Sequence, residues 1–287
     1  MSANAVGDSS HSQYPRLFSP LRLGPVEIRN RVVFAPTYSS WTTDPFNGII
    51  SDMGKAYWAE RARGGVGLVT IGATTVHPSG RASSSAFPQL YDDRNVGALR
   101  GVADAIHATG AKVGVQLYHG GLRNPPLLQQ HPGANPDAPW HSLAPSEMAL
   151  GEMPGSGTAK ELEEDEIRSI IDSFGAAAAR AMDAGVDGVE FHLAHGYLAH
   201  QFLSPFYNKR TDRWGGTLEN RLRFSAEALR SMREAVGDRG YVGYRISAKT
   251  FWEHDMGLEE TVEAVAALRD QVETDYVSVS IGIHHAW

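Results

Sequence analysis

Short β-branched runs alternate with amphipathic helical runs along most of this 287-residue chain, and this alternation constrains the fold more than any other feature. Strands and helices that alternate regularly form a parallel sheet covered by helices. The sequence therefore predicts an α/β fold with six strands, and the strand-like segments lie at residues 31–35, 67–72, 112–117, 188–192, 241–247 and 276–281.

The helical segments between these runs carry their apolar residues at helical spacing. In residues 95–108, for example, Leu99, Val102, Ala103 and Ile106 fall on one face, and Gly110 follows as a stop signal. A (β/α) barrel and an open doubly wound sheet both satisfy this pattern. No G-x-G-x-x-G motif follows a strand and no phosphate loop is present, which favours the barrel.

We therefore predict a (β/α)8 TIM-type barrel, incomplete because about six of its eight βα units are present. Residues 26–30 are expected to form an N-terminal cap hairpin ahead of the first core strand. Residues 118–158 are rich in proline and glycine and lack periodicity, which is typical of a functional loop over a site. The barrel is expected over 15–287, after a small, polar and disordered leader at 1–14.

Composition excludes several classes of function. The formal charge of −7 argues against a general nucleic-acid or anionic-membrane surface. The absence of cysteine excludes disulfides, zinc–thiolate sites, catalytic thiols and iron–sulfur clusters ligated by this chain. No apolar run approaches the ~18 residues of a membrane span, and the leader lacks the apolar core of a signal peptide. A cytoplasmic protein with a small-molecule substrate is the expectation.

Polar residues gather where the predicted strands end. In a (β/α) barrel the carboxyl ends of the strands face the active site. The positions that follow the strands are Pro36-Thr37-Tyr38, Gly72-Ala73, Gln116 to His119, His192 to Tyr197, Arg245 and His284-His285. A set this polar predicts a site that binds a polar cofactor and a polar substrate.

The segment EFHLAHGYL places two imidazoles and a phenol at the end of one strand. Hydrogen bonds from His192 and His195 to a carbonyl oxygen would withdraw electrons from a conjugated double bond and favour hydride addition, while Tyr197 could supply the proton. Two alternatives stay open. The histidines could be packing or capping residues, or they could form a His-x-x-His metal site, although no third ligand stands at a defined spacing.

Arg245 lies within an otherwise apolar strand, and a buried guanidinium needs an anionic or electron-rich partner. An ion pair with a neighbouring strand, for instance with Glu190, is one interpretation. The other is a positive charge beside the pyrimidine edge of a flavin, where it would stabilise the reduced ring. Gln116 could donate to and accept from the same edge.

Several segments, in order, resemble the Old Yellow Enzyme family of flavin oxidoreductases. They are LFSPLRLGPVEIRNRVVFAP, GGVGLVTIGATTVHPSGR, QLYHGGLR, SLAPS and, most specifically, GVDGVEFHLAHGYLAHQFLSPFYNKRTDRWGGTLENRLRF. The YNKRTDRWGG and SIGIHHAW segments are most similar to the branch that contains 2,4-dienoyl-CoA reductase and trimethylamine dehydrogenase. The resemblance extends from about Leu17 to Trp287.

The resemblance implies FMN and NAD(P)H as cofactors and assigns a role to individual residues. Tyr197 would be the catalytic proton donor and His284 would assist it, with His285 as the alternative in register. His192 and His195 would bind the substrate oxygen. The flavin would be lined by Pro36, Thr37, Tyr38, Ala73, Gln116 and Arg245. Two departures are a Tyr38 where relatives carry Cys or Thr, and an extra residue in HGGLR.

A third departure concerns the end of the barrel. The family's seventh and eighth strands, which supply its FMN phosphate site, are not found here, so the barrel is expected to be truncated after its sixth strand. An open sheet leaves strand edges unpaired. We therefore expect a homo-oligomer or a partner subunit that supplies the missing strands.

Three functions are compatible with the sequence. The first is an ene-reductase that moves hydride from NAD(P)H through FMN to an α,β-unsaturated carbonyl or thioester. The second is a flavin-dependent amine dehydrogenase or N-demethylase, in which Trp252, Trp287 and Tyr38 would help to form an aromatic cage for a cation. The third is a non-catalytic subunit whose barrel a partner chain completes.

Overall fold

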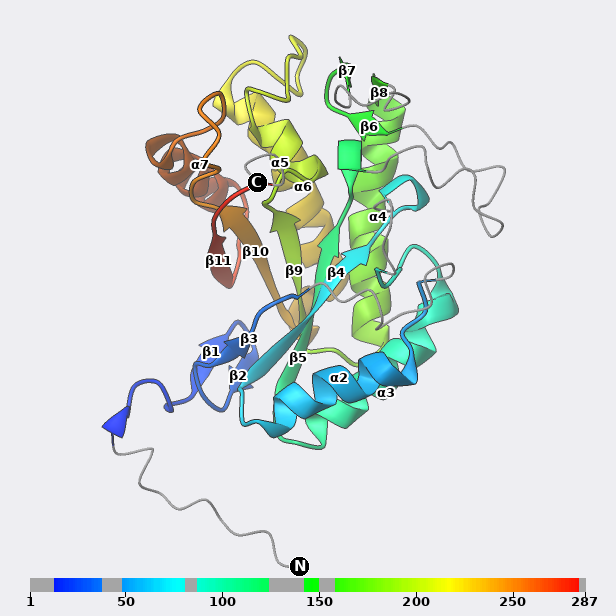
Figure 1. Ribbon diagram of the computed structural model, residues 1–287, viewed down its shortest axis with the longest axis vertical. Helices are drawn as coiled ribbons and strands as arrows, with labels where there is room; N and C mark the ends of the chain where they lie inside the picture. The colour runs from blue at the N-terminus through cyan, green and yellow to red at the C-terminus, as the bar shows by residue number, and fades with distance from the viewer. Residues whose placement is uncertain (1–12, 38–47, 81–86, 124–141, 150–157, 284–287) are drawn as a thin grey trace, which may run out of the picture.

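A computed structural model describes residues 13–37, 48–80, 87–123, 142–149 and 158–283 of the chain. Its centre is a curved sheet of six parallel strands (Figure 1). Across the sheet the strands follow their order in the chain: β3 (Val33–Phe34), β4 (Leu68–Thr75), β5 (Lys112–Tyr118), β9 (Gly188–Leu193), β10 (Tyr241–Ser247) and β11 (Tyr276–Ser280). The predicted strands are confirmed at all six places.

The main helices form one layer around the outside of this sheet (Figure 1). They are α2 (Asp52–Arg63), α3 (Val96–His107), α4 (Glu164–Asp183), α6 (Leu218–Val236) and α7 (Leu258–Gln271). Each packs against the next along the chain. A doubly wound sheet would instead reverse its strand order and carry helices on both faces. The winding is therefore that of a (β/α) barrel, and the predicted fold class is confirmed.

An antiparallel hairpin caps the amino-terminal ends of the strands. It comprises β1 (Leu21–Leu23) and β2 (Val26–Ile28). Leu23, Val26 and Ile28 are buried and pack with residues at the starts of β4 and β10. The predicted cap hairpin is therefore present, but it begins before residue 26, because its first strand is only three residues long and carries no clear alternation.

The space enclosed by the strands is filled by tyrosine rings that lie over glycines. A Cβ on Gly114 or Gly188 would come within 2.5 Å of an atom of Tyr241, and one on Gly243 would come within 2.2 Å of Tyr276. These close approaches require glycine, because any other residue would displace the ring. The rings occupy the amino-terminal part of the interior and leave the carboxyl ends of the strands open for a site.

Two features differ from the predicted connections. Part of the segment expected to be an aperiodic loop forms a small sheet of β6 (Leu143–Ala144), β7 (Met148–Ala149) and β8 (Thr158–Glu161), and α5 (Leu198–Leu203) follows β9 directly. Short 3₁₀ turns are η1 (Pro78–Gly80), η2 (Asp93–Asn95), η3 (Gly121–Arg123) and η5 (Gly237–Arg239). Residues 1–12 of the expected leader lie outside the described residues.

Within the described ranges, the structure has no helix that combines the length and the apolar character needed to cross a membrane.

Candidate active site

A cavity of about 280 Å³ opens at the carboxyl ends of the strands. Seven of the predicted site residues line it together: Pro36, Ala73, Gln116, His192, His195, Tyr197 and Arg245; the other lining residues are Phe87, Ile281, Gly282 and Ile283. Thr37 is exposed, and its hydroxyl donates to the carbonyl of Ala35 at 3.1 Å. Tyr38 and His284 fall outside the described residues.

The two histidines face each other at one side of the cavity. His192 Nε2 lies 3.4 Å from His195 Nδ1. Because the backbone N–H of Ala194 donates to His192 Nδ1 at 3.3 Å, a neutral His192 carries its proton on Nε2. His195 Nε2 lies 2.8 Å from the hydroxyl oxygen of Ser280, which belongs to β11. Both rings therefore have a fixed orientation, with N–H groups suited to an oxygen ligand.

The turn between β9 and α5 positions Tyr197. His195 has a φ of 63° and Gly196 a φ of 79°, a left-handed pair that reverses the chain directly after the strand. The Tyr197 ring then packs edge-on against Tyr118 and His192, with ring centroids 5.1 Å and 4.9 Å apart. The phenol is thereby held next to the imidazole pair.

A buried glutamine holds this turn in place. Gln201 Nε2 donates to the carbonyl of Gly196 at 2.7 Å, and its Oε1 accepts from the N–H of Leu122 at 3.3 Å. The same side chain thus joins the Tyr197 turn to η3, the segment after β5. Gln201 does not stand out in the sequence, because a glutamine within a short apolar segment has no distinguishing pattern.

On the other side of the cavity, Glu190 fixes the amide of Gln116. Gln116 Nε2 donates to Glu190 Oε1 at 2.6 Å, and the hydroxyl of Tyr276 donates to Glu190 Oε2 at 2.7 Å. Burial raises the pKa of Glu190, although these two hydrogen bonds and the charge of Arg245 oppose the shift. One N–H of Gln116 is thus engaged, and its Oε1 lies 3.3 Å from the place that a Cβ on Gly72 would take.

Arg245 contributes donors that no described residue accepts. Its Nη2 donates to Ser280 Oγ at 3.3 Å, whereas Nε and Nη1 are buried and have no hydrogen-bond partner within the described ranges. Within the described ranges, no ion pair joins it to Glu190, the alternative that the sequence left open. Unmatched buried donors of a permanent cation fit an electron-rich ligand edge. Together with the Gln116 acceptor, they fit the pyrimidine edge of a flavin.

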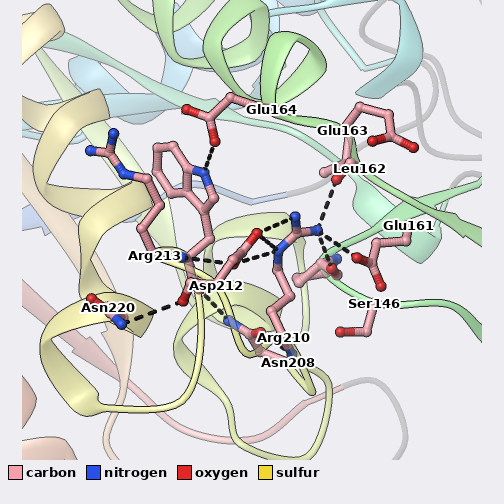
Figure 2. Close-up of polar contacts among 12 residues, drawn as sticks. Ser146, Glu161, Leu162, Glu163, Glu164, Asn208, Arg210, Asp212, Arg213 and Asn220 are labelled. Atoms are coloured by element: carbon pink, nitrogen blue, oxygen red, sulfur yellow. Dashed lines mark hydrogen bonds and ion pairs between the residues drawn. The ribbon is translucent and has the colours of Figure 1, made fainter.

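Side chains of the segment 204–217 make hydrogen bonds to main-chain groups of neighbouring segments (Figure 2). Arg210 donates to the carbonyls of Pro145 and Leu162, both at 2.8 Å, and its other edge binds Asp212. Asn208 Nδ2 donates to the carbonyls of Phe202 and Trp214. The YNKRTDRWGG motif therefore ties the segment after α5 to the small sheet and to α4.

Other predicted candidates lie away from the cavity or beyond the described residues. Trp252 packs against Phe206 and His254 and does not line the cavity; Trp287 and Tyr38 are outside the described ranges. The proposed aromatic cage for a cation thus gains no residue from the described part. In that part, no three His, Cys, Asp or Glu residues gather as ligands for a metal ion.

Comparison with known proteins finds similarity along almost the whole chain. Residues 16–286 match the NADH:flavin oxidoreductase / NADH oxidase family. The NADH oxidase of Thermoanaerobacter brockii is 37% identical over 276 residues, which cover 96% of this chain and 40% of that protein. The chain therefore spans about two fifths of the length of this relative.

Solved structures of similar fold extend the comparison. The 2-naphthoyl-CoA reductase complex with 2-naphthoyl-CoA superposes with a TM-score of 0.85 at 29% identity, covering 95% of this chain and 41% of that one. The Old Yellow Enzyme from Pichia sp. AKU4542 gives a TM-score of 0.79 at 30% identity, covering 92% of this chain and 70% of that one.

Proposed function

The chain belongs to the NADH:flavin oxidoreductase / NADH oxidase family, and on that premise we propose that it reduces the carbon–carbon double bond of an α,β-unsaturated carbonyl compound or thioester, with FMN and NAD(P)H as cofactors. One observation carries the proposal. A single cavity is lined on one side by the His192–His195 pair and Tyr197, and on the other by Gln116 and the unmatched donors of Arg245.

The residues present fit the flavin ring. FMN, when bound, supplies the hydride that it has accepted from NAD(P)H. Arg245 would donate Nε–H and Nη1–H to the electron-rich edge of the ring, and Gln116 Oε1 would accept from its N–H group. Pro36, Thr37, Tyr38 and Ala73 are proposed to complete the lining around the ring. The guanidinium charge would favour the reduced, anionic ring.

The remaining residues act on the substrate. His192 Nε2–H and the His195 ring hold the carbonyl oxygen, so that electron density leaves the double bond as hydride adds to the β-carbon. Tyr197 then delivers a proton to the α-carbon, and the phenolate that results is reprotonated from solvent. One hydride and one proton are thus added, and the C=C bond becomes single. His284 is proposed to assist Tyr197 in this proton transfer.

We also propose that the 287-residue chain associates with a second copy of itself or with a partner subunit. The support is the sheet itself: β3 and β11 are its two edges, each with one neighbour among the described strands. Strand edges of this kind pair readily with other strands.

The proposed activity is tested with purified protein supplied with FMN. We expect NAD(P)H-dependent reduction of 2-cyclohexenone or crotonyl thioester. The reaction is monitored by the loss of NAD(P)H absorbance. Tyr197→Phe removes the proton donor and should lower kcat by about 10²-fold. Tyr14→Phe, at an exposed phenol, is the matched control. Absence of any enone reduction would contradict the activity, and equal turnover by Tyr197→Phe would contradict the role given to Tyr197.

A further inference from the structure

A second unmatched arginine lies next to the proton donor. Arg123 ends the 3₁₀ turn η3, which directly follows β5 and contacts α5 and β6. Leu122, its neighbour in the chain, is tied through the Gln201 side chain to Gly196, the residue before Tyr197. The position of Arg123 is therefore coupled to the turn that carries the catalytic phenol, although Arg123 itself is not among the residues that line the cavity.

No carboxylate of the described residues forms an ion pair with the guanidinium of Arg123. Its Nε and Nη2 atoms are buried and have no hydrogen-bond partner in the described part of the chain. Burial lowers its pKa, and among the described titratable groups only the hydroxyls of Tyr197 and Tyr207 act on it to raise the pKa. Neither group is an anion at neutral pH. A desolvated cation without an anionic partner is costly in free energy, so the site is suited to a ligand that brings the negative charge.

The atoms left unmatched indicate which ligand this would be. Elsewhere in the molecule the same edge, Nε together with Nη2, holds a carboxylate. Arg94 binds Asp92 Oδ2 at 2.9 Å and 2.6 Å, and Arg210 binds Asp212 Oδ2 at 3.1 Å and 2.7 Å. This edge presents two parallel N–H groups whose spacing matches the two oxygens of a carboxylate.

We propose that Arg123 is a second substrate anchor that binds a carboxylate, so that the preferred substrates are unsaturated carbonyl compounds carrying a carboxylate beyond the reacting double bond. The anchor rests on the proposed function, because it places the substrate between Arg123 and the His192–His195 pair. A carboxylate is favoured over a phosphate because a single guanidinium edge is offered and no other described cation acts on Arg123. The anchor would hold the α-carbon near Tyr197.

The test compares two saturated, unreactive ligands: 3-oxocyclohexane-1-carboxylate and its methyl ester. Their dissociation constants are measured by calorimetry on the FMN-supplied protein, so that no turnover is required. We expect the wild type to bind the carboxylate about 10-fold more tightly than the ester. Arg123→Met should abolish this difference, and Arg123→Lys should retain part of it, because an ammonium keeps the charge but not the two-pronged edge.

Arg100→Met is the matched control, since Arg100 is an exposed arginine on α3 that bonds a backbone carbonyl, and it should keep the wild-type preference. Three results would overturn the anchor. The wild type could bind both ligands with equal affinity, it could bind neither, or Arg123→Met could keep the preference for the carboxylate. The comparison of the carboxylate with the ester in the wild type tests the anchor even if Arg123→Met fails to fold. Reduction of neutral 2-cyclohexenone tests the proposed function separately, so failure of the anchor and failure of the reductase activity give different results.

Discussion

Arg210 and Arg245 are both largely shielded from solvent, but their hydrogen bonds differ. Every edge of Arg210 meets a carboxylate or a backbone carbonyl, so its charge is satisfied within the protein (Figure 2). Arg245 keeps two buried donors unmatched and faces the cavity. A matched guanidinium stabilises a fold, whereas an unmatched one costs stability unless a ligand binds. This contrast separates Arg210, which holds the segment 204–217 in place, from Arg245, which is proposed to hold the flavin.

The sequence pointed to some of these residues and not to others. Arg245 stood out because a charged residue within an apolar strand is unusual, and His192, His195 and Tyr197 stood out because they cluster at a strand end. Glu190 was recognised only as a possible partner of Arg245, since the sequence does not show which side chains on adjacent strands meet. Arg123 lies in a turn, where an arginine is ordinary. The absence of a described carboxylate beside its guanidinium becomes visible only from its three-dimensional surroundings.

The pKa of Asp255 provides a test of the contacts that hold α5 and its carboxyl-terminal end. Asp255 is buried, which opposes ionisation, but His200 at 3.0 Å, Ser204 at 2.5 Å and the N–H of Met256 outweigh burial and lower its pKa below 3.8. A lowered pKa in the folded state stabilises the protein above the unfolded value and loses that contribution as the pH falls through the folded value. Asp255→Asn should therefore cost about 3 kcal/mol at pH 7.

The difference in unfolding free energy between wild type and Asp255→Asn should narrow as the pH falls below about 4. Urea unfolding of both proteins at pH 7, 5 and 3 measures this difference in free energy. Asp238→Asn, at an exposed carboxylate in η5, is the control and should differ from wild type by less than about 0.5 kcal/mol. A cost for Asp255→Asn that stays constant down to pH 3 would show that ionisation of Asp255 does not contribute to stability.

At the scale of elements, the long periodic segments were predictable and the short ones were not. The helices α3, α4 and α6 could be predicted from the sequence, because each has an apolar face that is buried and a polar face opposite to it. All six residues of α5 are buried, so the sequence shows no polar face from which to recognise a helix. The strands β6 and β7 have two residues each, too few to show a period.

The segment 204–217 illustrates how such regions are ordered. It has little regular structure, and Arg210, Asn208 and Asp212 organise it through hydrogen bonds to backbone groups (Figure 2). Contacts of this kind depend on which carbonyl, distant in the sequence, lies close in space. Periodicity in the sequence does not predict them, although the YNKRTDRWGG motif itself carried the family resemblance. The family and the barrel-type fold were thus predictable, while the contacts that order the segment 204–217 required the structure.

At the scale of the whole molecule, the outer edges of β3 and β11 pair with no other described strand. The side chains of Val277 and Val279 on β11, and of Ile281 directly after it, are 39%, 67% and 58% exposed. Apolar side chains along an unpaired edge favour association with another strand or surface. The sequence predicted six strands and therefore two edges among them. It did not predict that the side chains of Val277, Val279 and Ile281 would be exposed.

We expect the chain to exceed its monomer mass of 31.1 kDa in solution at micromolar concentration. Val279→Lys places a charge on the exposed edge and should shift the mass toward the monomer, because charged residues on an edge strand oppose pairing. Light scattering across a concentration series measures this. Lys substitution at the exposed Met53 on α2 is the control. A wild type that is monomeric at every concentration would contradict self-association through β11.

The carboxyl ends of the strands are proposed to hold a flavin, with Arg245 and Gln116 at the edge of its ring. Titration of the protein with FMN, followed by quenching of FMN fluorescence, tests it most directly. The wild type should bind FMN, and Arg245→Met should raise the dissociation constant at least about 10-fold, because donors to an electron-rich edge are lost. Arg269→Met, with a side chain 78% exposed, should leave it unchanged. Equal FMN affinity in the wild type and Arg245→Met, or no FMN binding by the wild type, would contradict the account.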